Sequence, residues 1–206
     1  MVEVGIAVAK KAMRGRMLSV RDALGCDSRE QLSAAITDSL LALPEFAAAR
    51  IVAGYVSFGS EFDTEAFNAA VLASGKGLVL PRIDRPRRAM IFHSVNELQE
   101  SLLPGVWGIR EPDPLACPRA ELDDVDLMLV PGLAFTSRCE RLGYGGGFYD
   151  AAIDLTQPRA IKIAAAFSSQ VVDALLVEPH DRIVDMVVTE NGSYSSGRDS
   201  YVKLEG

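Results

Sequence analysis

Histidine and cysteine are scarce in this sequence, which has two histidines and three cysteines in 206 residues. Histidine is a common zinc ligand, so His93 and His180 alone make a histidine-based zinc site improbable. Cys26, Cys117 and Cys139 have neither metal-ligand nor disulfide spacing, and their number is odd. Free thiols are typical of a reducing compartment, so we expect a cytoplasmic protein.

Basic residues are too few for a broad positive surface. The chain carries 21 lysines and arginines against 28 acidic residues, a net charge of −7. This balance argues against a nucleic-acid partner. No apolar run reaches the ~18 residues of a membrane helix, and we expect neither a secretory leader nor a membrane partner. The sequence shows no surplus of exposed amphipathic segments that would imply a protein partner. We therefore expect the partners to be small molecules.

Motifs for covalent or redox chemistry are missing as well. The sequence has no Ser-His-Asp order, no Cys-His partnership and no Cys-x-x-Cys. A composition of 49% apolar and 24% charged residues is that of an ordinary globular protein. At 206 residues the chain is long enough for a sizeable core, and no linker marks a boundary, so we expect one domain over residues 1–206.

Helical and strand-like segments alternate along the chain. We predict helices at about 5–24, from Ser28 to Pro44, at about 64–74 and at 148–155, with a helical turn at 170–176. Ser28 and Gln31 have capping-box spacing at the start of the second helix. Strands are predicted at 51–56, 78–80 (ended by Pro81), 89–93, 125–130, 161–167 and 186–189, with loops at 57–63 and 101–109. This alternation predicts an α/β fold, with a mostly parallel sheet covered on both faces. The tail at 191–206 is expected to be edge structure, disordered or partly non-native.

A glycine-rich segment follows the predicted strand at 125–130. Glycines at 143, 145, 146 and 147 allow positive φ and a close approach of the backbone to a ligand. Their N–H groups, together with a helix starting near Tyr149, are suited to an anion. Arg141 at the entrance offers a forked donor for phosphate, and Asp150 at the exit offers a ligand for Mg²⁺. The alternative is a flexible turn. Since no Gly-Lys-Ser/Thr follows, the segment is not a Walker A motif.

Three basic residues lie on one face of the first predicted helix. Lys10, Arg14 and Arg21 fall within about 40° of one another at 100° per residue, beside an apolar stripe. Two interpretations stay open, a solvated basic face and a clamp for phosphates. In the second, Arg21 is expected to matter less, because it lies about 10 Å beyond Arg14 along the helix axis.

These segments together resemble the 5-formyltetrahydrofolate cyclo-ligase family over nearly the whole chain. The segments that match are Lys10-x-x-x-Arg14, Glu61-Phe-Asp-Thr64, Leu80-Pro-Arg82, Pro104-Gly-Val-Trp-Gly-Ile-Arg-Glu-Pro112, Val130-Pro-Gly-Leu-Ala-Phe135, Arg141-Leu-Gly-Tyr-Gly-Gly-Gly-Phe-Tyr-Asp150, and His180-Asp181 with Asp185 and Val188-Thr-Glu190. Each segment is weak alone, but their order and spacing are specific. The resemblance implies a single three-layer α/β/α domain. It also implies conversion of 5-formyltetrahydrofolate to 5,10-methenyltetrahydrofolate with Mg²⁺ and ATP.

The resemblance also assigns roles by position. The residues implied to bind ATP are Lys10, Arg14, Arg141, Leu142, Gly143, Tyr144, Gly145, Gly146, Gly147 and Tyr149. Those implied to bind the folate substrate are Val56, Glu61, Trp107, Tyr144, Phe148 and Tyr149. Asp150 and Asp181 are implied to bind Mg²⁺, with Asp185 as the alternative to Asp181. Glu61 alternatively caps the helix at Thr64, and Trp107 alternatively belongs to the core.

Three positions depart from the family pattern. Thr136 stands where an aspartate is usual, Cys139 where glycine is common, and Phe148 where tyrosine is usual. The first two predict a differently shaped lead-in loop without the loss of an implied contact, and Phe148 keeps a stacking face but lacks the hydroxyl. Two other functions stay open, a binder of nucleotide or folate without activity, and an enzyme for another phosphate-bearing substrate.

Overall fold

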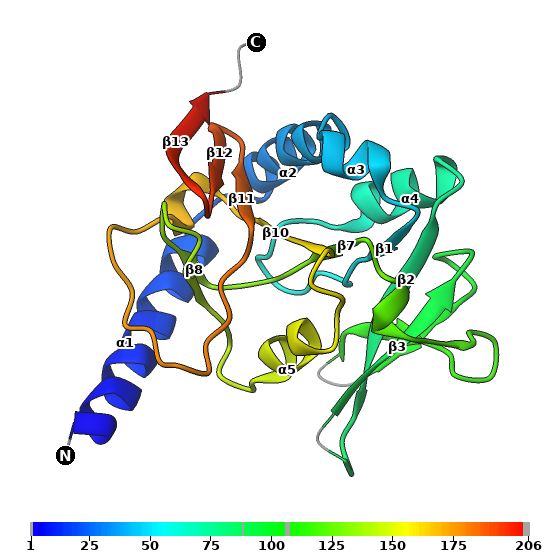
Figure 1. The fold of residues 1–206 in the computed structure, drawn as a ribbon, viewed down its shortest axis with the longest axis horizontal. Coiled ribbons are helices and arrows are strands. Elements are labelled where there is room, and N and C mark those ends of the chain that lie inside the picture. The colour runs from blue at the N-terminus through cyan, green and yellow to red at the C-terminus, as the bar shows by residue number, and fades with distance from the viewer. Residues whose placement is uncertain (1, 88, 106–107, 204–206) are drawn as a thin grey trace.

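A nine-stranded sheet runs through the computed structural model (Figure 1), which describes residues 2–87, 89–105 and 108–203. The strand order is β13-β12-β11-β10-β7-β1-β2-β3-β6. The five central strands are parallel: β11 (Met186–Thr189), β10 (Ile161–Ala165), β7 (Leu127–Leu129), β1 (Ile51–Ala53) and β2 (Gly77–Asp84). Antiparallel strands extend both edges: β3 (Ala89–Val95) and β6 (Arg119–Ala120) on one, β12 (Gly192–Ser195) and β13 (Arg198–Lys203) on the other. The predicted α/β fold with a mostly parallel central sheet is confirmed.

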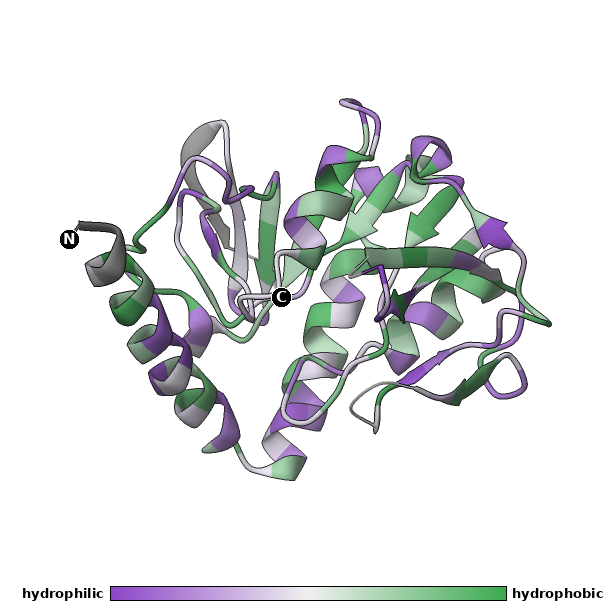
Figure 2. Ribbon diagram, turned by 90° about the horizontal axis from the view of Figure 1, so that it is seen from below, coloured by the Kyte–Doolittle hydropathy of each residue, from purple (hydrophilic) through white to green (hydrophobic). Residues whose placement is uncertain are grey.

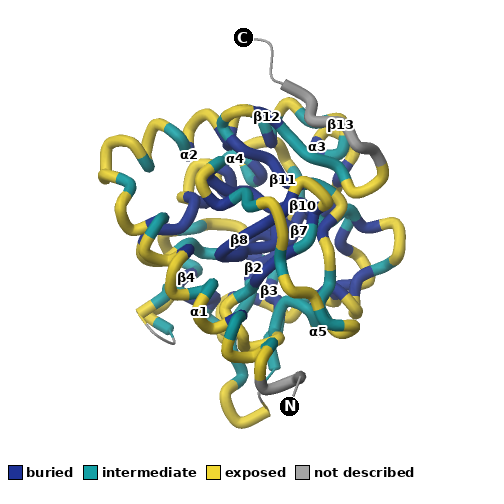
Figure 3. Tube along the Cα trace, turned by 90° about the vertical axis from the view of Figure 1, so that its left-hand side faces the viewer, coloured by how far each residue is buried: buried dark blue, intermediate teal, exposed yellow. Residues whose placement is uncertain are grey.

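Helices cover both faces of the sheet, because its central strands are apolar on both sides. Alternate strand residues point to opposite faces, so Val52 and Leu127 pack against α2 (Cys26–Leu41), α3 (Pro44–Ala48) and α4 (Glu65–Ala73). Ala53 and Met128 pack on the other side against α5 (Phe148–Asp154) and the strand β8 (Ala134–Phe135). The central strands are accordingly largely dark blue in Figure 3 and mainly green in Figure 2.

Helix α1 (Val2–Asp22) lies beside these layers and is held by its apolar stripe. Met17 is buried against Leu133, Ala134 and Leu142, so the helix packs on the hairpin of β8 and β9 (Arg141–Leu142). Polar residues occupy much of the rest of the helix, which is green and purple in turn in Figure 2. Among the helices that the structure describes, none combines the length and apolar character needed to cross a membrane.

The boundaries of α2 differ from the prediction. The helix begins at Cys26, with Gly25 in an extended conformation as its N-cap and no side-chain cap. Ser28 therefore lies within the first turn and forms no capping box. The helix ends at Leu41, and Pro44 starts α3, where a missing N–H leaves no hydrogen bond unmade.

Pro81 does not end β2 as predicted. The neighbouring strand β1 pairs only with Gly77–Val79, so beyond that point no partner requires an N–H from Pro81 on that side. Pro81 instead pairs with Phe92 in the antiparallel ladder to β3. The segment expected as loop at 101–109 contains β4 (Leu102–Pro104), which pairs with β5 (Arg110–Pro112).

Three further segments differ from the sequence-based expectation. The helical turn predicted at 170–176 is wrong. A short 3-10 helix covers Ser168–Gln170, and Val172 then donates its N–H to the carbonyl of Phe135 at 2.8 Å. Strands β1, β7 and β10 are shorter than predicted, and a 3-10 turn (Leu122–Asp124) precedes β7. Up to Lys203 the tail forms edge strands.

Candidate functional site

A cavity of about 710 Å³ opens where the carboxyl ends of β1, β2 and β7 meet the glycine-rich loop. Ligands of parallel sheets bind at this edge. The described residues that line it are Tyr55, Val56, Phe58, Glu61, Pro81, Ile83, Arg85, Met90, Ile109, Arg110, Glu111, Pro131, Arg141, Gly143, Tyr144, Gly145, Gly146, Gly147, Phe148, Tyr149 and Asp150. The cavity therefore brings most of the residues singled out in the sequence to one place.

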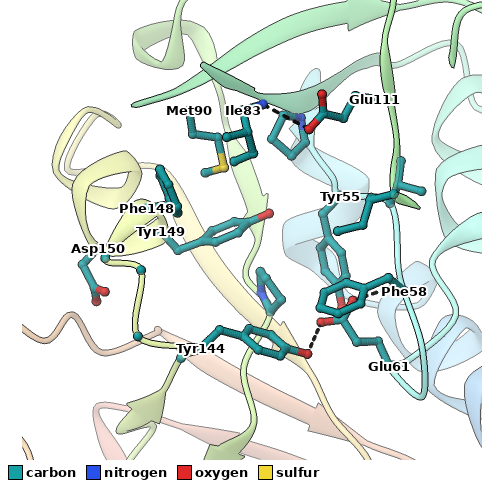
Figure 4. A pocket seen from close by; sticks show the side chains of 18 of the residues that line it. Tyr55, Phe58, Glu61, Ile83, Met90, Glu111, Tyr144, Phe148, Tyr149 and Asp150 are labelled. Carbon is teal, nitrogen blue, oxygen red and sulfur yellow. Dashed lines mark hydrogen bonds between the residues drawn. The ribbon is translucent and has the colours of Figure 1, made fainter. Parts of the chain in front are cut away.

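Glu61 and Tyr144 form the polar contact on one side of the cavity (Figure 4). Glu61 is buried, accepts the N–H of Phe58 at 3.0 Å and accepts the Tyr144 hydroxyl at 2.5 Å. Burial raises the pKa of Glu61, while the hydrogen bonds from Tyr144 and Phe58 and the charge of Arg21 oppose the rise. These bonds tie Glu61 to the cavity. At the start of α4, Asp63 Oδ1 accepts the N–H of Glu65 at 3.0 Å, so the alternative of Glu61 as the cap of this helix is wrong.

Aromatic and apolar side chains form the walls of the cavity. The ring of Phe58 lies 5.4 Å from the ring of Tyr144, and Phe148 and Tyr149 approach from α5 (Figure 4). Burial raises the pKa of Tyr149 well above its ordinary value, and nearby Glu61 raises it further. Its hydroxyl is therefore a neutral hydrogen-bonding group. The walls can hold a flat, partly apolar ligand.

The buried Arg141 and the half-buried Asp150 form an ion pair at the cavity. Arg141 Nη2 donates to Asp150 Oδ1 at 2.6 Å, and Nη1 donates to the carbonyl of Pro131 at 3.2 Å. Among the described residues, nothing accepts a hydrogen bond from the buried Nε of Arg141. Asp150 Oδ1 also accepts the N–H of Arg182 at 3.0 Å. Since Arg182 directly follows Asp181, the two predicted metal ligands lie on adjoining segments.

The glycine-rich loop needs its glycines at specific positions. Gly145 and Gly147 have φ of 95° and 71°, which other residues rarely adopt. A Cβ on Gly143 would lie 2.7 Å from Arg141 Nη1, and one on Gly146 would lie 2.8 Å from the Phe148 ring. The alternative of a flexible turn is not what the contacts show. The loop is built around Arg141 and Phe148.

Two residues of the predicted basic face of α1, Lys10 and Arg14, reach the loops beside the cavity. Arg14 Nε donates to the carbonyl of Gly143 at 2.8 Å, so Arg14 lies against the glycine-rich loop. Lys10 is 6% exposed and contacts Glu178 and Asp181 at 2.6 and 2.5 Å. Burial lowers the pKa of Lys10, but the hydrogen bonds to Asp181 and Glu178 outweigh this and raise it.

The third residue of this basic face, Arg21, is 1% exposed and contacts Tyr144 and Ser60. The solvated-face interpretation of the basic line is therefore wrong. From the sequence, Arg21 is expected to matter least, since it lies furthest along the helix axis. The sequence could not reveal that the last turn of α1 is buried against the loop that carries Ser60.

Other predicted residues lie away from the cavity or outside the described residues. Leu142 packs its side chain against Met17 in the core, so only its backbone can face a ligand. Asp181 contacts Lys10 and lies next to Arg182, whose N–H bonds to Asp150. Asp185 instead directly precedes β11, where its carboxylate accepts the N–H of Lys162. Of these two acids, Asp181 is the one beside the site. Trp107 lies outside the described residues.

The structure adds residues to the site to which the sequence analysis gave no role. Tyr55 and Pro131 follow β1 and β7, Ile83 and Met90 lie in β2 and β3, and all four line the cavity. Such residues are common in and after buried strands, so they carry no signal in a single sequence. Glu111 is buried at the cavity, where Oε1 accepts the N–H of Ile83 at 3.3 Å and Oε2 lies 3.5 Å from Arg82 Nη1.

The departures at Thr136 and Cys139 are accommodated in the turn between β8 and β9. Thr136 Oγ1 donates to Glu140 Oε2 at 2.8 Å. Cys139 has φ of 64°, a conformation that favours glycine, and its side chain is buried. Burial raises the pKa of its thiol to about 11, so the thiol is protonated and unreactive at neutral pH. Arg141 directly follows this turn, but its side chain bonds to Pro131 and Asp150 outside it.

Comparisons with known proteins point to a single family. The model of the 5-formyltetrahydrofolate cyclo-ligase family matches residues 6–190. The chain is 27% identical to a mouse 5-formyltetrahydrofolate cyclo-ligase, over 95% of this chain and 100% of that protein. It is 32% identical to the Mycolicibacterium smegmatis enzyme of the same name, over 68% and 73%. The solved structure of Aquifex aeolicus 5,10-methenyltetrahydrofolate synthetase matches with a TM-score of 0.81, 30% identity, and 95% and 96% coverage.

Proposed function

The chain belongs to the 5-formyltetrahydrofolate cyclo-ligase family, and we propose that it converts 5-formyltetrahydrofolate and ATP into 5,10-methenyltetrahydrofolate, ADP and phosphate. The observation that carries the proposal is the cavity itself. It has an aromatic wall with the Glu61–Tyr144 pair on one side, and Arg141 with the glycine-rich loop on the other. Such a cavity suits a flat heterocycle with N–H donors beside a polyphosphate.

The proposed reaction needs no nucleophilic side chain. The terminal phosphoryl group of ATP passes to the formyl oxygen, and its bond to the ADP oxygen breaks. The N10 lone pair attacks the formyl carbon, phosphate leaves with the former formyl oxygen, and the N10 proton is lost to solvent. An amide-like oxygen leaves poorly, so phosphorylation makes its departure feasible. Catalysis of phosphoryl transfer is mostly positioning and charge stabilisation, which Arg141 and the loop N–H groups can provide.

At the phosphate side, Arg14 and Arg141 would bind the triphosphate with the backbone of residues 143–147. Their placement supports this, because Arg141 and the loop line the cavity and Arg14 is bonded to the carbonyl of Gly143. Lys10 would join once phosphate competes with Glu178 and Asp181 for its ammonium group. The Tyr149 hydroxyl and the Leu142 backbone are the remaining proposed contacts.

The residues at the end of the loop fit a magnesium ion. Asp150 Oδ1 accepts hydrogen bonds from Arg141 and from the N–H of Arg182, which leaves Oδ2 for a ligand. Asp181 directly precedes Arg182, so this bond brings the segment of Asp181 next to Asp150. Carboxylate oxygens are the ligands that Mg²⁺ prefers. We propose that Asp150 and Asp181 hold the ion, which when bound supplies charge neutralisation on the phosphates.

At the folate side, Glu61 would accept N–H groups of the pterin ring, and Val56, Tyr144, Phe148 and Tyr149 would enclose the ring. The assignment of Trp107 to this wall stays a prediction. We also propose that residues 1–206 act as one domain. A cytoplasmic location remains a proposal, supported by the free thiols of Cys26, Cys117 and Cys139. The expected lack of nucleic-acid and protein partners stays a prediction.

The proposal is tested by following the absorbance of the methenyl product with 5-formyltetrahydrofolate and Mg-ATP. We expect a signal that requires both ATP and Mg²⁺ and that falls sharply in Glu61→Gln. Folded protein that binds the folate or ATP by calorimetry yet gives no product would instead be a binder without this activity. Turnover of another phosphate-bearing substrate alone would favour the diverged enzyme.

A further inference from the structure

Arg21 is buried behind the cavity and does not line it. It comes from the last turn of α1, is 1% exposed and directs its guanidinium towards the loop after β1. Its Nε donates to Ser60 Oγ at 3.0 Å, and Ser60 Oγ in turn donates to Asp22. A cation is costly to bury unless hydrogen bonds and opposite charge compensate for it, so its partners identify its role.

The other end of the guanidinium meets the two polar residues of the folate side. Arg21 Nη1 donates to the Tyr144 hydroxyl at 2.9 Å and lies 4.0 Å from Glu61 Oε1. The Tyr144 hydroxyl donates to the same Glu61 oxygen at 2.5 Å, and Arg21 Cζ is 5.8 Å from the Tyr144 ring centre. The three side chains come from α1, the loop after β1 and the glycine-rich loop, so one cation joins the segments that form the cavity.

We propose that Arg21 is a positioning residue for the folate substrate, which holds Tyr144 and Glu61 together as one acceptor for the N–H groups of the pterin ring. The inference rests on the proposed function. It assigns to Arg21 a role in folate affinity rather than in ATP binding, because its contacts are to the polar pair of the folate side.

The charges around Glu61 support this role. Burial raises the pKa of Glu61, and the charge of Arg21 opposes the rise, alongside hydrogen bonds from Tyr144 and the Phe58 N–H. Neutral tyrosine hydroxyls also face Glu61, from Tyr55 beyond β1 and from Tyr149 on α5. Without Arg21, the folded protein would protonate Glu61 at a higher pH. A protonated Glu61 loses the charge that strengthens its acceptance of ligand N–H groups.

The test compares Arg21→Met and Arg21→Lys with Arg16→Met, which changes an exposed arginine on the same helix. In Arg21→Met we expect KM for 5-formyltetrahydrofolate to rise roughly tenfold or more, as for the loss of a charge-assisted hydrogen bond, while KM for ATP changes little. The acid limb of kcat/KM should move to higher pH. Arg21→Lys keeps the charge, so its acid limb should stay near that of the wild type, and Arg16→Met should match the wild type throughout.

A structural role alone would lower Tm without this split between the two KM values. The inference is overturned if folded Arg21→Met keeps the wild-type KM for folate, or if KM rises equally for both substrates. In protein that already carries Glu61→Gln, Arg21→Met should raise KM for folate little further. If the two substitutions have fully additive effects on the free energy calculated from KM for folate, this also contradicts the inference. Should Arg21→Met not fold, Tyr144→Phe and Arg21→Lys decide, since each must raise KM for folate at least a few-fold.

Calorimetric Kd values for 5-formyltetrahydrofolate give the same comparison without turnover. Wild-type protein that neither binds nor converts the folate overturns the proposed function and this inference together. An active wild type with an Arg21→Met variant of unchanged folate KM and Kd overturns the inference alone.

Discussion

Asp150→Asn separates the structural and chemical roles of one carboxylate. Asp150 Oδ1 accepts from the buried Arg141 at 2.6 Å and from the N–H of Arg182 at 3.0 Å. The asparagine carbonyl keeps both acceptor positions and removes the charge. A hydrogen bond to a charged group contributes about 1.5–3 kcal/mol and a neutral one about 0.5–1.5 kcal/mol, so two weakened bonds amount to about 2 kcal/mol. For a chain of this length, that corresponds to a fall in Tm of about 4–8 °C.

The effect on catalysis should be much larger than the effect on stability. A hard cation requires the carboxylate charge, and its loss removes several kcal/mol of transition-state stabilisation, which is roughly a hundredfold or more in turnover. The matched control is Asp154→Asn on the same helix, whose carboxylate forms an exposed ion pair with Arg182. We expect the control to keep nearly full Tm and turnover.

Scanning calorimetry, product absorbance and folate titration measure the three quantities. The reasoning is refuted if Asp150→Asn loses folate affinity while its dependence on Mg-ATP stays normal. It is also refuted if Asp154→Asn impairs turnover as much as Asp150→Asn does.

Three further predictions concern the phosphate side. In Arg14→Ala, kcat/KM for ATP should fall roughly 10- to 150-fold in steady-state assays, with little change in KM for folate, and an unchanged value would exclude the clamp. Burial raises the pKa of Asp181, but Lys10 and the N–H of Glu178 outweigh this, so the pKa of Asp181 is lowered in the folded protein. The ionised Asp181 therefore stabilises the fold above the ordinary aspartate pKa, and this stabilisation is lost as the pH falls through the lowered pKa. Between pH 6 and 3, Tm should therefore fall less in Lys10→Met than in the wild type, and an equal fall would contradict the ion pair. Gly143→Ala should lower Tm and turnover together, because its Cβ would lie 2.7 Å from Arg141 Nη1; a variant with wild-type values in both would show that the loop is adaptable.

The sequence was sufficient for the features that local patterns encode. The apolar runs at 127–129 and 186–189 are buried strands, and the glycine-rich segment forms the wall of the cavity. The alternation of helices and strands predicted the central parallel sheet. These features follow from periodicity and from glycine geometry, which depend on neighbouring residues alone.

Features that depend on distant partners were not predictable. Pro81 continues a strand because β1 ends before it, and residues 170–176 are not helical because Val172 pairs with Phe135. The burial of Arg21 depends on where Ser60 and Tyr144 lie after folding. A single sequence gives the face of a helix on which a residue lies, but not what packs against that face.

The central claim is that the formyl oxygen of the substrate becomes phosphorylated and leaves as part of phosphate. Its most direct test uses 5-formyltetrahydrofolate labelled with ¹⁸O in the formyl group, with Mg-ATP and mass analysis of the released phosphate. We expect each phosphate to carry one labelled oxygen, matched to the methenyl product formed. Unlabelled phosphate, with the label released to water, would contradict the proposed mechanism.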